Sequence, residues 1–277
     1  MADLRMLFPN GLMKALTLSY DDGVEQDARL LGIMNHYGLK GTFNLNSSQF
    51  APEGTVYPEG QIHRRMTEKA TVELLANSGQ EVAIHACYHG DLPALPAAHA
   101  VWQVVRDKEQ LENLFGRIVR GMAYPYGTYS TEFTHTLRDC GVAYARTVHS
   151  THRFDLPSDW LTLPATCHHN DPELMNLAKA FVEQKPWRAQ LFYLWGHSYE
   201  FEADNNWNVI EAFAEYIGGR DDIWYATNIQ IHDYVEAWRS MHISADGRRF
   251  HNPSAMPLWL DVDRKVYCIE SGGDLAV

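Results

Sequence analysis

Two adjacent aspartates end the first long apolar run of this sequence. The run 14–20 leads directly into Asp21 and Asp22, and Gly23 follows them. Neighbouring side chains of an extended segment point to opposite sides, so the two carboxylates need not share one task. Two like charges held this close are unfavourable unless a cation or a shared proton relieves them. A turn or a helix cap can carry the same residues, so the pair depends on partners elsewhere in the chain.

Two histidines follow another apolar run and offer such partners. His85 and His89 form an H-x-x-x-H motif at the end of the run 80–85. Together with one carboxylate they would make a two-histidine, one-carboxylate set, which suits a divalent metal. An isolated motif of this kind more often marks ordinary polar histidines, but Asp22 at a matching strand end favours a ligand set. Zinc is the first candidate, and cobalt, nickel and manganese are alternatives.

Further polar groups follow other apolar runs. Tyr124 and Tyr126 flank Pro125, and His197 comes directly after the run 190–196. The pair His168–His169 is interpreted as polar loop residues near a pocket rather than as a second metal site. Candidate walls of a substrate pocket are Trp160, Trp195 and His169. For each single tryptophan, packing in the core is the competing interpretation.

The elements that must position these residues alternate regularly. Helical periodicity separates runs of strand length, which predicts parallel strands joined by crossover helices. Seven or eight such units favour a closed barrel over an open doubly wound sheet. The expected strands are 14–20, 41–46, 80–85, 118–124, 142–147, 161–167, 190–196 and 223–228. The expected helices are 24–37, 67–78, 97–115, one from Asp171 to near Pro186, 206–217 and 229–241.

The candidate residues share one rim of this barrel. Apart from the loop 155–160, each lies at the carboxyl end of an expected strand, where (β/α) barrels build their active sites. We expect the barrel to span residues 1–241 and a short β-hairpin, 242–277, to be appended to it, because 257–263 alternates in polarity before a second short run. No G-x-G-x-x-G motif follows the first strand, which argues against a dinucleotide site.

Composition excludes several classes of partner. The net charge of −12 over 277 residues disfavours nucleic acid and anionic membrane surfaces. The four cysteines form no C-x-x-C pair, which argues against a disulfide framework or a thiolate zinc site. We see neither a signal peptide nor an apolar stretch long enough for a membrane span, so a cytoplasmic location is expected. The sequence leaves the oligomeric state open.

These motifs together resemble the metal-dependent polysaccharide deacetylases, the NodB-homology domain of carbohydrate esterase family 4. The family signature T-F-D-D-G corresponds to residues 19–23, H-S/T-x-x-H to residues 85–89, and the third motif, ending in P-Y-G, to residues 123–127. The histidine of the last motif corresponds to His197. The resemblance covers about residues 14–200, and the combination is specific although each piece is not.

The resemblance implies a role for each matching position. Asp21 would be the catalytic base, and Asp22, His85 and His89 would bind the metal. The backbone N–H of Tyr126 would help to hold the oxyanion, and His197 would be the general acid. The implied fold is a distorted (β/α)7-type barrel. The implied reaction is metal-dependent hydrolysis of acetyl groups on an N- or O-acetylated carbohydrate.

Three departures from the family pattern stand out. Ala86 replaces the serine or threonine whose hydroxyl steadies the histidine loop. Ala123 stands where many members have an arginine that pairs with the catalytic aspartate, and Arg120 is three residues away. The fourth motif is matched only loosely, so either Asp155 or Asp159 is expected to orient His197.

Two other functions fit the same residues. The first is a hydrolase of this fold that acts on a non-sugar amide. The second is a carbohydrate-binding protein that has lost catalysis, although the intact base, ligands and acid argue against it.

Overall fold

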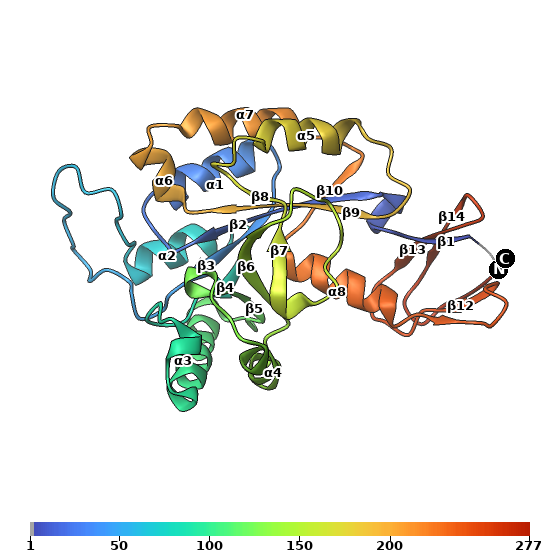
Figure 1. Cartoon of the computed structure of the whole chain (residues 1–277), viewed down its shortest axis with the longest axis horizontal. Coiled ribbons are helices and arrows are strands. Elements are labelled where there is room, and N and C mark those ends of the chain that lie inside the picture. The colour runs from blue at the N-terminus through green and yellow to red at the C-terminus, as the bar shows by residue number, and fades with distance from the viewer. Residues whose placement is uncertain (1–2) are drawn as a thin grey trace.

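A curled parallel sheet forms the centre of the molecule. The computed structural model describes residues 3–277, and within them nine strands make a nearly closed barrel with the order β7-β6-β5-β4-β3-β2-β9-β8, while β10 pairs with β2 (Figure 1). The strands are β2 Lys14–Asp21, β3 Gly41–Leu45, β4 Glu81–Ile84, β5 Gly121–Ala123, β6 Tyr144–Ser150, β7 Leu163–Ala165, β8 Cys167–His168, β9 Gln190–Gly196 and β10 Ile223–Tyr225. The predicted α/β barrel of the (β/α)7 type is confirmed.

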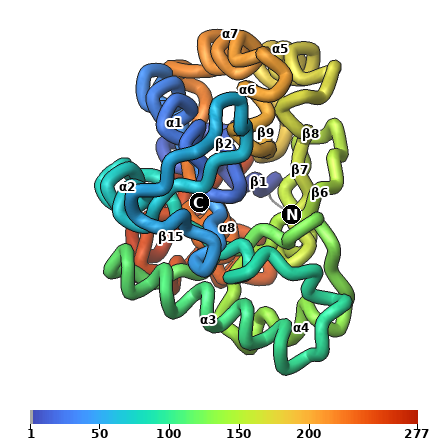
Figure 2. The backbone as a smooth tube through the Cα atoms, turned by 90° about the vertical axis from the view of Figure 1, so that its left-hand side faces the viewer, coloured from blue at the N-terminus to red at the C-terminus, as the bar shows by residue number. Residues whose placement is uncertain are grey.

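Helices surround this sheet on its outer side (Figure 2). They are α1 Asp27–His36, α2 Glu68–Leu75, α3 Ala97–Phe115, α4 Thr131–Asp139, α5 Leu174–Glu183, α6 Ser198–Ala203, α7 Trp207–Ile217 and α8 Asn228–Arg239. The sequence analysis did not predict α4 and α6, which are short. In α4 the side chain of Ser130 accepts a hydrogen bond from the N–H of Phe133 and so caps the first turn.

Strand β2 is the centre of the sheet because three strands pair with it. β9 follows it along one edge, while β10 and then β3 share the other edge. All eight residues of β2 are buried, and in the pairing with β3 Asp21 lies opposite Asn44. The aspartate pair therefore begins at the end of a strand that is buried along its whole length.

The C-terminal region is larger than the expected hairpin. The hairpin is present as β13 Leu258–Val262 and β14 Lys265–Ile269, and its two turn residues both have positive φ. The N-terminal strand β1, Leu4–Leu7, pairs antiparallel with β13 and completes a sheet of three strands. A second sheet joins β11 His242–Ile243, β12 Arg249–His251 and β15 Asp274–Ala276. A domain boundary at residue 241 stays a prediction.

The two ends of the molecule differ in what covers them. In Figure 1 the loop between β3 and α2, drawn in cyan, projects at the left, whereas strands β12, β13 and β14 lie at the right. The candidate active residues belong to the left end, where β2 finishes. No helix within residues 3–277 has the length and apolar character required to cross a bilayer.

A buried carboxyl group links several strands inside the barrel. Glu81 accepts hydrogen bonds from the hydroxyls of Thr42 at 2.8 Å and Tyr144 at 2.7 Å, and from the N–H of Ile229 at 2.9 Å. Gly121 leaves the space that this arrangement needs, because a Cβ there would lie 2.1 Å from the Tyr144 hydroxyl oxygen. A glycine is therefore required at this position of β5.

Replacing Gly121 by alanine should destabilise the barrel. The added methyl must displace Tyr144 and break its bond to Glu81, and overpacking of this kind lowers the free energy of unfolding by about 1–3 kcal/mol. Gly32→Ala is the control, because nothing lies within 4 Å of that position in α1, and it should gain about 0.5–1 kcal/mol. Urea unfolding followed by circular dichroism measures both, and an unchanged midpoint for Gly121→Ala would contradict the packing argument.

Candidate metal centre and active site

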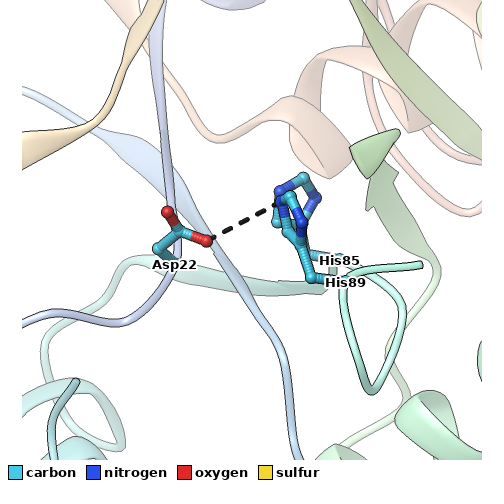
Figure 3. A group of neighbouring side chains, drawn as sticks. All are labelled: Asp22, His85 and His89. Atoms are coloured by element: carbon cyan, nitrogen blue, oxygen red, sulfur yellow. Dashed lines mark ion pairs between the residues drawn. The ribbon is translucent and has the colours of Figure 1, made fainter. Parts of the chain in front are cut away.

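Three predicted ligands converge at the rim of the barrel. Asp22 follows β2, His85 follows β4, and His89 lies in the turn after His85 (Figure 3). One donor atom from each lies within 4.8 Å of the others, and Asp22 Oδ1 is 4.0 Å from His89 Nε2. The group combines two imidazoles with one carboxylate, as expected from the sequence.

The protonation of His85 fits a metal ligand. Its Nδ1 lies 2.8 Å from the carbonyl oxygen of Ala123, so the ring proton sits on Nδ1 and the Nε2 lone pair is free. Burial lowers the pKa of His85 to about 4, which keeps the imidazole neutral near pH 7. Burial also lowers the pKa of His89. Both rings are therefore in the form that coordinates a divalent cation, and the residues present fit such a group.

Asp21 is buried beside this set and faces two of the histidines. Its Oδ2 lies 3.8 Å from His85 Nε2 and 3.7 Å from His197 Nε2. Its Oδ1 accepts a hydrogen bond of 2.8 Å from the amide of Asn44. Burial alone would raise the pKa of Asp21, but Arg146 and the two histidines outweigh it and hold the pKa below its usual value. Asp21 is therefore an anion, as a general base must be.

Arg146 takes the place of the arginine that the family pattern puts at position 123. It projects from β6, is 1% exposed, and donates a hydrogen bond from Nη2 to Asp21 Oδ2. Its guanidinium carbon also lies 4.4 Å from the ring centre of Trp195. Arg120 does not substitute, because it pairs with Asp233 of α8. The sequence analysis missed Arg146, although an arginine inside an apolar strand was a usable signal.

Asn46 steadies the histidine loop, which is the role expected of the hydroxyl that Ala86 lacks. Its amide donates to the carbonyl oxygens of His85 at 2.6 Å and of Ala86 at 2.8 Å. Ala86 has a φ of 57°, so this turn adopts a conformation that an alanine rarely takes. The histidine loop is thus fixed through its backbone by a residue that follows β3. Asn46 was also missed by the sequence analysis.

Glu200 orients His197, which corrects the expectation placed on the loop 155–160. His197 Nδ1 lies 3.2 Å from Glu200 Oε1, three residues further on in the chain. Asp155 instead pairs with Arg153 and Arg188. Asp159 accepts from the N–H of Leu161 and the hydroxyl of Thr162. Glu200 lies in helix α6, which the sequence analysis did not predict.

The carboxylate of Glu200 also lies close to two more histidines. Glu200 Oε2 lies 3.2 Å from His168 Nε2 and 3.1 Å from His169 Nε2. His168 Nδ1 accepts a hydrogen bond from the N–H of Asn170, so its proton sits on Nε2 and points to Glu200. This tautomer leaves no Nε2 lone pair for a metal. The three histidines thus surround Glu200 at ion-pair distance, and the interpretation of His168 and His169 as polar loop residues stays a prediction.

His197 lies between two carboxylates. Burial alone would lower its pKa, but the hydrogen bond to Glu200 and the charge of Asp21 outweigh it, so the pKa is raised. Burial alone would raise the pKa of Glu200, but the three histidines around it outweigh burial and hold that pKa far below its usual value. His197 is therefore stabilised as the imidazolium, the form that can donate a proton.

The three predicted pocket walls are less exposed than a sugar platform requires. His169 is 0%, Trp160 7% and Trp195 8% exposed. Trp160 donates its indole N–H to Glu236 of α8, and Trp195 packs on Arg146. Neighbouring side chains cover all three rings. Trp195 and His169 contact residues of the site, whereas Trp160 packs against His232 of α8.

Tyr126 lies at the open side of the site. It is 65% exposed and its ring meets that of His89 edge to face at 4.6 Å. Its φ of 58° turns the backbone of the short helix Pro125–Gly127. The role of its N–H in holding an oxyanion stays a prediction.

Comparison with known families agrees with this geometry. Residues 10–145 match the family model described as polysaccharide deacetylase. The chain carries a polysaccharide deacetylase domain. The predicted family is confirmed, and with it the predicted class, a hydrolase that deacetylates carbohydrate. Family membership also suggests a divalent metal, without fixing which one.

Solved structures share the fold of the deacetylase domain at low sequence identity. A protein from Mycobacterium smegmatis, described as a polysaccharide deacetylase, is 16% identical, with a TM-score of 0.60, over 85% of this chain and 94% of that one. The peptidoglycan deacetylase PdaC from Bacillus subtilis is 18% identical, with a TM-score of 0.50, over 84% and 95%. A family 4 carbohydrate esterase from Streptomyces lividans, in complex with acetate, is 15% identical, with a TM-score of 0.50, over 78% and 93%. No functionally curated protein sequence matches the chain.

The pairing of Arg146 with Asp21 should be visible in the stability of the deacetylase domain. Arg146→Met leaves a buried carboxylate without its counter-charge, which lowers the free energy of unfolding by about 3–5 kcal/mol. The double variant Asp21→Asn/Arg146→Met removes both charges. Its free energy of unfolding should therefore fall less than that of Arg146→Met alone. Denaturant unfolding of the wild type, both single variants and the double variant measures this coupling. Additive losses in the cycle would show that the two groups do not interact.

Proposed function

We propose that this chain hydrolyses acetyl groups on an N- or O-acetylated carbohydrate, with a divalent metal ion held by Asp22, His85 and His89. The observation that carries the proposal is the position of Asp21. It is an anion that faces His85 and His197 yet is not needed in the ligand set. Zinc suits two imidazoles and one carboxylate best, and cobalt, nickel or manganese would also be accepted.

The reaction needs a base and an acid on either side of the acetyl carbon. A bound divalent metal polarises a carbonyl and lowers the pKa of water, and this is the chemistry that it would supply here. Asp21 takes the proton of the attacking water, since its pKa lies below the usual value and its carboxylate is ionised. The N–H of Tyr126 donates to the oxyanion of the tetrahedral intermediate.

His197 completes the reaction by giving a proton to the leaving group. Glu200 accepts from Nδ1, which leaves Nε2 directed toward Asp21 at 3.7 Å. An amine leaves poorly as an anion, so an N-acetyl substrate depends on this acid more than an O-acetyl ester does. The cytoplasmic location expected from the sequence stays a prediction.

Asp21→Asn tests the assignment of the base. Asparagine keeps the shape but cannot accept the water proton, so kcat should fall by about 10²- to 10⁴-fold. The three metal ligands are intact in this variant, and metal content should stay as in the wild type. The measurement is acetate release from a panel of N-acetylated and O-acetylated oligosaccharides, with metal analysis of the same samples.

Asp155→Asn is the matched control for this test, because Asp155 is also ion-paired but lies in the loop before β7. It should retain wild-type acetate release. Near-full activity in Asp21→Asn would refute the role of Asp21. Loss of metal along with activity would instead show that Asp21 is a ligand.

Glu200→Gln tests the acid through the pH dependence of the reaction. A general acid works when protonated, so kcat/KM falls as pH rises through the pKa of His197. Glu200 raises that pKa, and the neutral amide removes this effect. The basic limb of the pH profile should therefore move to lower pH in Glu200→Gln.

Glu202→Gln is the control in the same helix, because Glu202 pairs with Arg64 and not with His197. Its pH profile should match that of the wild type. A basic limb that stays in place in Glu200→Gln would show that His197 is not the group that titrates there.

A further inference from the structure

We propose that Arg65 is a positioning residue for the metal centre, holding the backbone and the carboxylate of Asp22 in the geometry that binds the ion. The proposal rests on the metal site of the proposed function but not on any particular substrate. Arg65 belongs to the loop between β3 and α2, which carries none of the sequence motifs of the site. Its side chain is 14% exposed.

The guanidinium of Arg65 donates hydrogen bonds to two groups of Asp22. Nη2 donates to the carboxylate oxygen Oδ1 at 2.9 Å, and Nη1 donates to the backbone carbonyl oxygen of the same residue. Asp22 has a φ of 86°, which a residue with a side chain adopts only when its surroundings enforce it. The fork of an arginine can fix main chain and side chain together, whereas a lysine offers a single ammonium group.

The same guanidinium connects the two halves of the ligand set. Nη1 also donates to Asn46 Oδ1 at 2.7 Å. Asn46 in turn holds the carbonyl oxygens of His85 and Ala86 through its amide. A continuous chain of hydrogen bonds thus runs from the aspartate ligand, through Arg65 and Asn46, to the histidine loop.

Backbone pairing keeps Arg65 in place. The N–H of Glu25 donates to the carbonyl of Arg64 at 2.8 Å, and the N–H of Met66 donates to the carbonyl of Gly23 at 2.9 Å. Arg64 adds ion pairs to Glu25 and Glu202. The short segment 62–66 is therefore attached to the residues that directly follow the aspartate pair.

The direction in which metal affinity changes on removal of Arg65 distinguishes a positioning role from the effect of its charge alone. Arg65 is cationic, so its charge alone repels a divalent ion and its removal would tighten metal binding. Its hydrogen bonds have the opposite effect, because they hold Asp22 and the histidine loop in register before the ion arrives. Loss of a residue that orients a metal ligand commonly weakens metal affinity by about 10- to 100-fold.

The test is the dissociation constant for Zn²⁺, measured by competition with a chromophoric chelator on the full chain. We expect Arg65→Met to bind Zn²⁺ about 10- to 100-fold more weakly than the wild type. Arg65→Lys retains the positive charge on a single ammonium group. Its dissociation constant for Zn²⁺ should therefore lie between those of the wild type and Arg65→Met. Thermal unfolding of the metal-free proteins shows whether each variant is folded, and Arg65→Lys carries the test if Arg65→Met is not.

Two controls make the outcome specific. Arg64→Met removes the neighbouring cation, which touches no ligand, and should bind Zn²⁺ as the wild type does. His85→Ala removes a proposed ligand and should lose the ion. Binding by Arg65→Met as tight as in the wild type, or an equal loss in Arg64→Met, would overturn the positioning role. Retention of Zn²⁺ by His85→Ala would instead overturn the metal site of the proposed function.

Discussion

The repulsion between two buried carboxylates is the constraint on which the rest of this site depends. Asp21 and Asp22 are 2% and 7% exposed, and each would be unstable there as an isolated charge. The structure gives each acid a guanidinium of its own, Arg146 for one and Arg65 for the other. The sequence suggested that a cation or a shared proton would relieve this repulsion. The arginines already do so, which leaves the carboxylates charged and oriented whether or not an ion is bound.

The three departures from the family pattern are compensated in the same way. In each case a side chain from elsewhere in the chain contacts the residue that the missing group was expected to hold. Arg146 replaces an arginine at position 123, Asn46 replaces a hydroxyl at position 86, and Glu200 replaces an acid expected near residue 155. The physical requirement comes from the position in the folded protein. A buried carboxylate or a strained turn needs a hydrogen-bond partner there, whichever residue supplies it.

Local patterns predicted the barrel and the residues that lie together at its rim. Apolar runs and helical periodicity predicted the barrel strands, except that the single run 161–167 is two strands, β7 and β8, and they predicted six of the eight described helices. Asp22, His85 and His89 were predicted because ligand type, spacing and strand ends all appear in the sequence.

Partners that depend on tertiary contact were not predictable in this way. Glu200 was not predicted as a site residue, because it reaches His197 only through the fold of α6, where the fully buried Phe201 lies beside it. Nothing local to Arg65 or Asn46 shows that both reach the ligand loops. A rule that looks for charged residues inside apolar runs would have found Arg146, but not its partner.

Closure of the barrel explains why that partner was hidden. Asp21 is on β2 and Arg146 is on β6, and β3, β4 and β5 lie between them in the sheet. Strands are spaced about 4.8 Å apart, so in a flat sheet the two strands would be separated by roughly 19 Å. The two side chains are nevertheless in hydrogen-bond contact, because the sheet curls and both point into its interior. The charge state of the candidate base therefore depends on a contact across the barrel, because a separation of β2 from β6 would remove the arginine that lowers the pKa of Asp21.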